Sequence, residues 1–154
     1  MRNNLNISIL GLGYVGLPLA IKLSNFFNVI GFEKNKQRIK ELKNFLDKNN
    51  EISSKQLKKS KLHYSTNIKD LKKSNIFIVT VPTPVTKSNK PDLKPILSAC
   101  KDIGKIILKG SIVVFESTVY PGVTEEICGP QIKKYSNLIS GKDFYLGYSP
   151  ERMN

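Results

Sequence analysis

Short apolar segments and longer amphipathic segments alternate along the 154-residue chain. The short segments are rich in isoleucine, valine and phenylalanine, a composition that favours buried β-strands. The pattern predicts strands at residues 5–10, 29–33, 62–65, 76–81, 112–116 and 144–148.

Between these strands, apolar residues recur every three or four positions, which is the period of one helix face. The stripes are Val15, Leu19, Leu23 and Phe26, then Ile39, Leu42 and Leu46, and finally Ile96, Cys100, Ile103 and Ile107. Shorter helices are expected after Asn67, as an N-cap, and around Pro121, which suits a first helical turn. Pro130 is expected to kink or end the latter helix.

The remaining segments are predicted to be loops. Residues 47–62 are polar and rich in lysine, which indicates a loop with a short surface helix, and residues 83–92 contain two prolines. Strands that alternate with helices in this way indicate a parallel sheet covered on both faces. The fold expected is therefore α/β, doubly wound, with a mainly parallel six-stranded sheet.

A glycine-rich loop, Gly11-Leu12-Gly13-Tyr14-Val15-Gly16, joins the first strand to the first helix. In dinucleotide-binding loops the first glycine permits a tight turn and the second lets the backbone approach a pyrophosphate. The third lets the helix pack closely on the strand. The helix N-terminus then presents N–H groups to the phosphates. This context makes the loop more specific than the glycine pattern alone and predicts a Rossmann-type domain.

Glu33 lies twenty residues after Gly13, at the end of the second predicted strand. A carboxylate there can accept hydrogen bonds from the adenosine ribose hydroxyls and would repel a 2′-phosphate, so NAD is expected rather than NADP. Two other interpretations are a tight glycine turn with an unrelated glutamate, and a methyltransferase of similar topology. The methyltransferase loop usually lacks a third glycine at this spacing.

Composition narrows the class of protein. The net charge of +13 raises the possibility of nucleic-acid binding, but the lysines are spread along the chain and few aromatic residues alternate with them. A solvated basic surface that attracts anionic nucleotides fits better. No apolar run approaches the roughly 18 residues of a membrane span, and the N-terminus lacks a secretory signal. We therefore expect a cytoplasmic protein that binds neither nucleic acid nor membranes.

Motifs in chain order carry a resemblance to a known family. They are residues 11–18, Glu33 with Arg38, residues 81–84 (Val-Pro-Thr-Pro), residues 117–122 (Ser-Thr-Val-Tyr-Pro-Gly), and residues 149–151 (Ser-Pro-Glu). Together they closely resemble the N-terminal NAD-binding domain of the UDP-glucose/GDP-mannose dehydrogenase family, over essentially the whole chain. That family oxidises the C6 alcohol of a nucleotide sugar to a carboxylate, with two NAD molecules consumed in turn and a cysteine that captures the aldehyde.

The resemblance implies a role for each matching residue. Those expected to bind the cofactor are Gly11, Gly13, Tyr14, Val15, Gly16, Glu33, Arg38, Val81, Pro82, Thr83, Ser117 and Thr118. Thr118 would position water or the reacting oxygen, and Glu151 would act as a general base or orient water. Without the resemblance, Thr83 could be only a turn residue, Arg38 a solvated helix residue, Ser117 and Thr118 helix caps, and Glu151 a surface carboxylate.

The resemblance also implies what lies elsewhere in the family. Its nucleophilic cysteine, central helix and C-terminal substrate domain belong to regions beyond residue 154, so this chain is expected to form one domain, residues 1–154, without turnover. The family's dimers are built largely from the central helix, so we expect a homodimer for the full-length protein and a monomer for this piece. Cys100 and Cys128 are predicted to be core residues, His63 has no assigned role, and no metal site is expected.

The last residues suggest the substrate branch. Arg152, Met153 and Asn154 follow Glu151 where the UDP-glucose branch usually has phenylalanine. With the Pro-Asp-Leu of residues 91–93, this ending looks more like enzymes that oxidise UDP-N-acetylhexosamines for capsules and O-antigens, and these three residues are expected to contact the substrate. A non-catalytic NAD-sensing module is the alternative function, and a basic nucleic-acid-binding protein is a third class.

Overall fold

The computed structural model describes residues 5–86 and 90–149. The described residues form one six-stranded sheet in the order β3-β2-β1-β4-β5-β6. Its strands are β1 (Asn6–Leu10), β2 (Asn28–Phe32), β3 (His63–Ser65), β4 (Ile76–Val79), β5 (Ile112–Phe115) and β6 (Tyr145–Tyr148). Every pair of neighbours in this sheet is parallel. The predicted doubly wound α/β fold is confirmed, and each predicted strand lies within two residues of the observed bounds.

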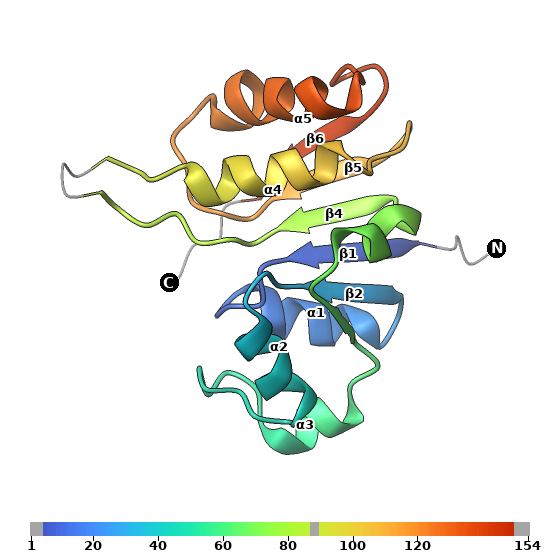
Figure 1. The fold of residues 1–154 in the computed structure, drawn as a ribbon, viewed down its shortest axis with the longest axis vertical. Coiled ribbons are helices and arrows are strands. Elements are labelled where there is room, and N and C mark those ends of the chain that lie inside the picture. Colours follow the sequence, from blue (N-terminus) through green and yellow to red (C-terminus); the bar gives the residue numbers. More distant parts are fainter. Residues whose placement is uncertain (1–4, 87–89, 150–154) are drawn as a thin grey trace.

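The helices fall into two groups, one beside each half of the sheet (Figure 1). The first group holds α1 (Gly16–Ser24), α2 (Lys36–Lys43) and α3 (Ser54–Lys59), and the second holds α4 (Lys94–Gly104), the π-helix η2 (Val123–Cys128) and α5 (Gly129–Ser136). A 3₁₀-helix, η1 (Ile68–Lys73), precedes β4, and the Asn67 side chain caps it as expected by accepting a hydrogen bond from Lys69 N–H. In Figure 1, α4 and α5 lie side by side.

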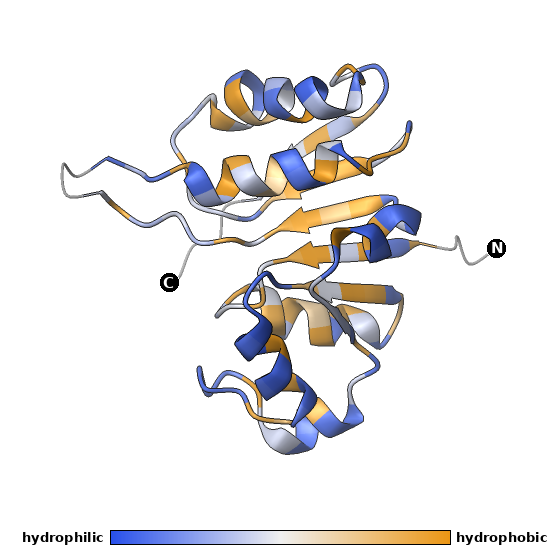
Figure 2. Cartoon of the chain, in the orientation of Figure 1, coloured by the Kyte–Doolittle hydropathy of each residue, from blue (hydrophilic) through white to orange (hydrophobic). Residues whose placement is uncertain are grey.

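The sheet separates two apolar cores. Ile7 and Ile9 of β1 belong to the core under α1, α2 and α3, whereas Leu10 belongs to the core under α4 and α5. This alternation follows from the twofold period of a strand. Figure 2 shows hydrophobic residues concentrated on the strands and hydrophilic residues on many outward positions of the helices.

Three predicted helical stripes extend past the ends of their helices. Helix α1 ends at Ser24, and Phe26, which was expected on its apolar face, is 76% exposed. Helix α2 ends at Lys43, because the chain turns at Phe45 with φ of 61°, and Leu46 is therefore 51% exposed. Helix α4 ends at Gly104, so Ile107 of the third stripe also lies beyond its helix, although it is buried. In all three cases the apolar spacing continues past the residue where the backbone leaves the helix.

The two proline predictions are wrong in position. The helix after Pro121 begins only at Val123, because Gly122 adopts a left-handed φ of 92° at its N-cap. Pro130 lies in the first turn of α5, which continues directly from η2 and runs on to Ser136. Where a kink or an end was predicted, the helix instead changes from π to α at Gly129.

The order of the strands determines where a ligand can bind. β1 and β4 are neighbours in the middle of the sheet, and the chain winds outward from them in opposite directions. The loops that follow these two strands therefore separate, and a crevice opens at the carboxyl ends. Among the described residues, no helix is long and apolar enough to cross a membrane.

Candidate functional site

A cavity of about 840 Å³ occupies this crevice. It is lined by residues at the carboxyl ends of four strands and by the segment after α2: Gly11, Leu12, Gly13, Tyr14, Val15, Glu33, Asn35, Arg38, Asn49, Glu51, Thr80, Val81, Pro82, Thr83, Glu116, Ser117 and Thr118. The structure thus brings together every predicted cofactor residue except Gly16, which packs beneath the loop.

The three glycines of the loop have different surroundings. Gly11 turns the chain with φ of 99°, a conformation that side chains rarely adopt. A Cβ on Gly16 would lie 1.9 Å from the Gly11 carbonyl oxygen and 2.3 Å from Thr80 Oγ1, so helix α1 could not pack as it does. A Cβ on Gly13 would meet nothing within 4 Å, because this part of the backbone faces open space. Gly11 and Gly16 therefore shape the loop, and Gly13 leaves its surface clear.

The Glu33 carboxylate holds the glycine loop against the end of β2. Its Oε2 accepts a hydrogen bond from Leu12 N–H at 3.1 Å, and its Oε1 accepts one from Asn35 N–H at 3.0 Å. Asn35 in turn caps α2 by accepting hydrogen bonds from the N–H groups of Gln37 and Arg38. Since a carboxylate has about four lone pairs, Glu33 retains acceptor capacity on the cavity side.

Arg38 is not the solvated helix residue of the alternative interpretation, since its side chain is only 11% exposed. Its Nε donates to the Leu12 carbonyl oxygen at 3.1 Å, and its Nη1 lies 2.8 Å from Oδ1 of Asp47. Arg38 and Glu33 thus contact the same loop residue, Leu12, one at the carbonyl and the other at the N–H.

Asp47 is buried and ionised. Burial alone would raise the pKa of its carboxyl. Hydrogen bonds from Arg38 and from the N–H groups of Ile52 and Asn49 outweigh that effect, so the pKa lies below its ordinary value. The same carboxylate accepts a hydrogen bond from Glu51 N–H at 3.0 Å. Asp47 therefore shapes the segment that brings Asn49 and Glu51 to the cavity wall.

Hydroxyl groups fix the opposite wall of the cavity. Ser117 Oγ donates to the Val81 carbonyl oxygen at 2.6 Å, Thr83 Oγ1 donates to the Thr118 carbonyl oxygen at 2.9 Å, and Tyr148 donates to the Val119 carbonyl oxygen at 3.1 Å. The first two bonds join the segments after β4 and β5, and the third joins β6 to the segment after β5. The interpretation of Ser117 and Thr118 as helix caps is wrong, because Gly122 is the N-cap of η2 and no side chain caps it among the described residues.

A smaller pocket of about 240 Å³ adjoins the cavity between the ends of β1 and β2 and helix α4. Its walls include Val81, Pro82, Pro95 and Ala99, which make it largely apolar. Lys34 spans it, donating to Ser98 Oγ at 2.6 Å and pairing with Asp102 at 2.5 Å.

Several residues of this site were missed from the sequence. Thr80 donates hydrogen bonds to the carbonyl oxygens of Leu10 and Gly11, which ties the end of β4 to the glycine loop. The strand predicted at residues 76–81 included Thr80, so the end of β4 at Val79 was not seen from the sequence. Asp47, Asn49 and Glu51 lie in the polar segment predicted to be a loop, and nothing in their spacing marked them.

Other predicted residues lie elsewhere. Glu151, Arg152, Met153 and Asn154 fall outside the described residues.

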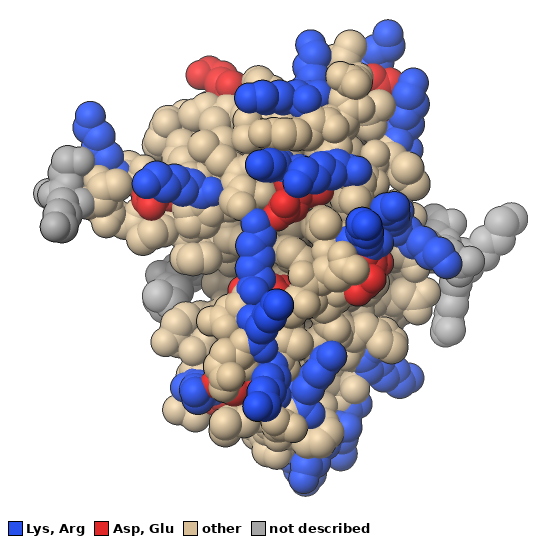
Figure 3. Space-filling view, viewed as in Figure 1, with Lys and Arg blue, Asp and Glu red and all other residues tan. Residues whose placement is uncertain are grey.

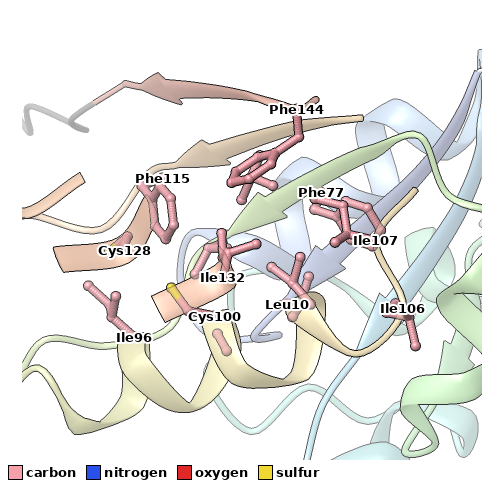
Figure 4. Packing of buried hydrophobic residues seen from close by; sticks show 14 of the residues in the cluster. Leu10, Phe77, Ile96, Cys100, Ile106, Ile107, Phe115, Cys128, Ile132 and Phe144 are labelled. Carbon is pink, nitrogen blue, oxygen red and sulfur yellow. The ribbon is translucent and has the colours of Figure 1, made fainter. Parts of the chain in front are cut away.

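Cys100 and Cys128 are free, buried thiols that face the core between α4 and η2 (Figure 4), as predicted. Hydrogen bonding to Cys128 and burial raise the pKa of the Cys100 thiol. Within residues 5–86 and 90–149, no group of three or more His, Cys, Asp or Glu side chains could hold a metal ion.

Basic side chains are distributed widely on the surface. Figure 3 shows Lys and Arg over the upper, middle and lower parts of one face, with fewer acidic groups between them. The charged residues that line the cavity are different, since they include Glu33, Glu51 and Glu116 together with Arg38. The basic surface and the carboxylate-lined cavity are thus separate features.

A model of the UDP-glucose/GDP-mannose dehydrogenase family, NAD binding domain, matches residues 5–154. Among curated proteins, the chain is 55% identical over 151 residues to protein CapL of Staphylococcus aureus, covering 98% of this chain and 36% of that protein. It is 49% identical over 152 residues to a UDP-N-acetyl-D-glucosamine 6-dehydrogenase of Pseudomonas aeruginosa, with the same coverage of 98% and 36%.

Solved structures agree with these matches. A UDP-D-ManNAc dehydrogenase from Pyrococcus horikoshii superposes with a TM-score of 0.88 at 32% identity, over 97% of this chain and 37% of that one. A ternary complex of a GDP-mannose dehydrogenase from Pseudomonas aeruginosa gives 0.87 at 30% identity, over 96% and 36%. The chain therefore spans little more than a third of the length of these proteins.

Proposed function

Because the chain belongs to the UDP-glucose/GDP-mannose dehydrogenase family, as its NAD-binding domain, we propose that it serves a nucleotide-sugar 6-dehydrogenase. The reaction is oxidation of the C6 alcohol of a UDP-N-acetylhexosamine to the uronic acid, for surface polysaccharide synthesis. The 49% identity to a UDP-N-acetyl-D-glucosamine 6-dehydrogenase and the 55% identity to CapL support this substrate class. The proposal includes a homodimeric full-length protein with a central helix and a substrate domain.

The observation that carries the proposal is the fit of the cavity to NAD. The backbone at Gly13 is open, and no side chain caps the N-terminus of α1 within the described part of the chain. Both features suit a pyrophosphate, which the helix dipole also attracts. Glu33 and Arg38 lie at the end suited to the adenosine ribose, and Val81, Pro82, Thr83, Ser117 and Thr118 lie on the facing wall.

Bound NAD would supply the hydride acceptor for the oxidation. The chain's own residues orient the reacting groups. Thr118 is exposed at the cavity wall, and the hydrogen bond from Thr83 to its carbonyl oxygen holds its backbone. We assign Thr118 to the positioning of water or the reacting oxygen, and Glu151 to the role of general base. Arg152, Met153 and Asn154 are assigned to substrate contacts.

The test is a substrate comparison on the full-length protein. UDP-N-acetylglucosamine, UDP-N-acetylgalactosamine and UDP-glucose are each supplied with NAD, and formation of NADH is followed by absorbance. We expect kcat/KM to be higher for one of the N-acetylated sugars than for UDP-glucose. A preference for UDP-glucose would overturn the substrate class, and NAD binding without oxidation of any nucleotide sugar would favour an NAD-sensing role.

A further inference from the structure

Arg38 is a basic residue near the adenosine end of the cavity of an NAD-binding domain. In related folds, an arginine near the end of the second strand accommodates the 2′-phosphate that distinguishes NADP from NAD. Arg38 lies five residues after Glu33, and both side chains line the same cavity. A free guanidinium there would attract the phosphate that Glu33 repels, so the site needs a device that suppresses its charge.

The contacts of Arg38 supply such a device. The Arg38 side chain is 11% exposed and that of Asp47 is fully buried, and their charged atoms lie 2.8 Å apart. Apart from this ion pair, the guanidinium makes one hydrogen bond among the described residues, from Nε to the Leu12 carbonyl oxygen, while Nη1 and Nη2 are buried and make none. Coulomb attraction at this distance is strong where water is excluded, so the pair acts as a neutral unit.

The position of Asp47 is set by its own segment. Its two carboxylate oxygens accept hydrogen bonds from the N–H groups of Asn49, Glu51 and Ile52 at 3.0–3.1 Å. These bonds keep the carboxylate in place independently of Arg38. The same turn brings Glu51 to the cavity wall, which adds a second carboxylate to the one at Glu33.

We propose that Asp47 is a specificity-determining residue for the cofactor. It neutralises Arg38 and holds Glu51 at the cavity wall. The 2′-phosphate of NADP would therefore meet no unpaired cation there, and it would be repelled by two carboxylates, Glu33 and Glu51. Glu33 acts on the ribose hydroxyls directly, whereas Asp47 acts through Arg38 and is a positioning residue. Discrimination between the two cofactors thus depends on Glu33 and Glu51 at the cavity and on Asp47 behind them.

The test is a set of binding measurements on the 154-residue chain by titration calorimetry, with NAD and NADP as the probes. The variants are Glu33→Ser, Asp47→Asn and the two combined. We expect the combined variant to bind NADP about 10-fold more tightly than Glu33→Ser alone, because a charge-assisted hydrogen bond to phosphate becomes available. Equal NADP affinity in the combined variant and in Glu33→Ser would overturn the proposal.

Asp143→Asn is the matched control. Asp143 also accepts a backbone hydrogen bond, from Ile139, and pairs with a basic side chain, Lys109, but it lies away from the cavity. Combined with Glu33→Ser, it should leave NADP affinity unchanged, whereas a gain equal to that from Asp47→Asn would contradict a specific role for Asp47. Titration of the unaltered chain with NAD reports separately on cofactor binding itself.

A second variant covers the case in which Asp47→Asn does not fold. The pair Arg38→Gln with Asp47→Asn keeps two amide groups in contact and removes both charges. Loss of Arg38 also removes a residue of the cofactor site, so the readout is the ratio of NADP to NAD affinity. In the Glu33→Ser background this neutral pair should leave that ratio within about twofold of its value in Glu33→Ser, since the original pair is already neutral. A fall of the ratio by about 10-fold or more would show that Arg38 already contacts the phosphate, and would overturn the proposal.

Discussion

At the scale of single residues, Glu33 has two structural tasks in addition to the proposed contact with ribose. One oxygen accepts the N–H of Leu12 in the glycine loop, and the other accepts the N–H of Asn35, the cap of α2. The carboxylate thus fixes the loop and the next helix relative to each other. Its remaining lone pairs face the cavity. Because these contacts already fix the carboxylate and the glycine loop, binding of a ligand costs little conformational entropy there.

Replacing Glu33 with alanine is expected to weaken NAD binding by about 10- to 100-fold, because charge-assisted hydrogen bonds to the ribose are lost. Circular dichroism should show that the fold persists, since both cores remain complete. Calorimetric titration measures the affinity, with Glu125→Ala on η2 as the control, because Glu125 is exposed and does not line the cavity. An unchanged affinity in Glu33→Ala would remove Glu33 from the site.

At the scale of elements, glycine residues serve two different purposes in the loop after β1. Gly16 is required by packing, because a Cβ there would clash with backbone and with Thr80 Oγ1. Gly13 is not required by packing, because the space around it is open. Its φ also lies outside the left-handed region, so alanine can adopt its conformation. Only a ligand gives a reason for glycine at position 13.

Gly16→Ala should therefore lower the free energy of unfolding by about 1–3 kcal/mol, as expected for overpacking. Gly13→Ala should change it by less than about 0.5 kcal/mol, as at an ordinary surface position, yet weaken NAD binding markedly. Urea denaturation and NAD titration of the two variants measure both quantities. If Gly13→Ala binds NAD as well as the unaltered chain, the pyrophosphate does not lie against this backbone.

Elements with strong periodicity could be predicted from the sequence, and those that depend on tertiary contacts could not. The apolar strands and the glycine loop follow local rules, and their predicted positions agree with the structure. The ends of α1 and α2 depend on where the backbone turns, as at Phe45, and an apolar spacing does not record that. Asp47 is a similar case, because its role arises only when a polar segment folds back onto Arg38.

At the scale of the whole molecule, acid sensitivity follows from the carboxylates. A hydrogen bond with Lys48 lowers the pKa of Glu41, the N–H of Ile139 lowers that of Asp143, and Asp47 also has a lowered pKa. A lowered folded-state pKa contributes stability above the unfolded-state value and loses it as pH falls through the folded-state value. Protonation also adds positive charge to a chain that already carries +13.

The free energy of unfolding should therefore fall steadily below about pH 4, near the ordinary pKa of Asp and Glu. Asp47→Asn should be less stable at pH 7, since a neutral amide leaves Arg38 unpaired, but should lose less stability on acidification. Urea denaturation between pH 3 and pH 7 gives both curves. If the free energy of unfolding falls equally with decreasing pH in the two proteins, Asp47 does not contribute to this acid sensitivity.

The whole chain is also expected to bind NAD without completing the proposed oxidation. Capture of an aldehyde needs an accessible thiol. The chain contains two cysteines, Cys100 and Cys128, which are 0% and 1% exposed in the core between α4 and η2 (Figure 4). Native protein should therefore react slowly with a thiol reagent, whereas both cysteines should react in urea. Purified chain mixed with NAD and a UDP-N-acetylhexosamine should form no uronic acid, and its formation would mean that another group on these 154 residues captures the aldehyde.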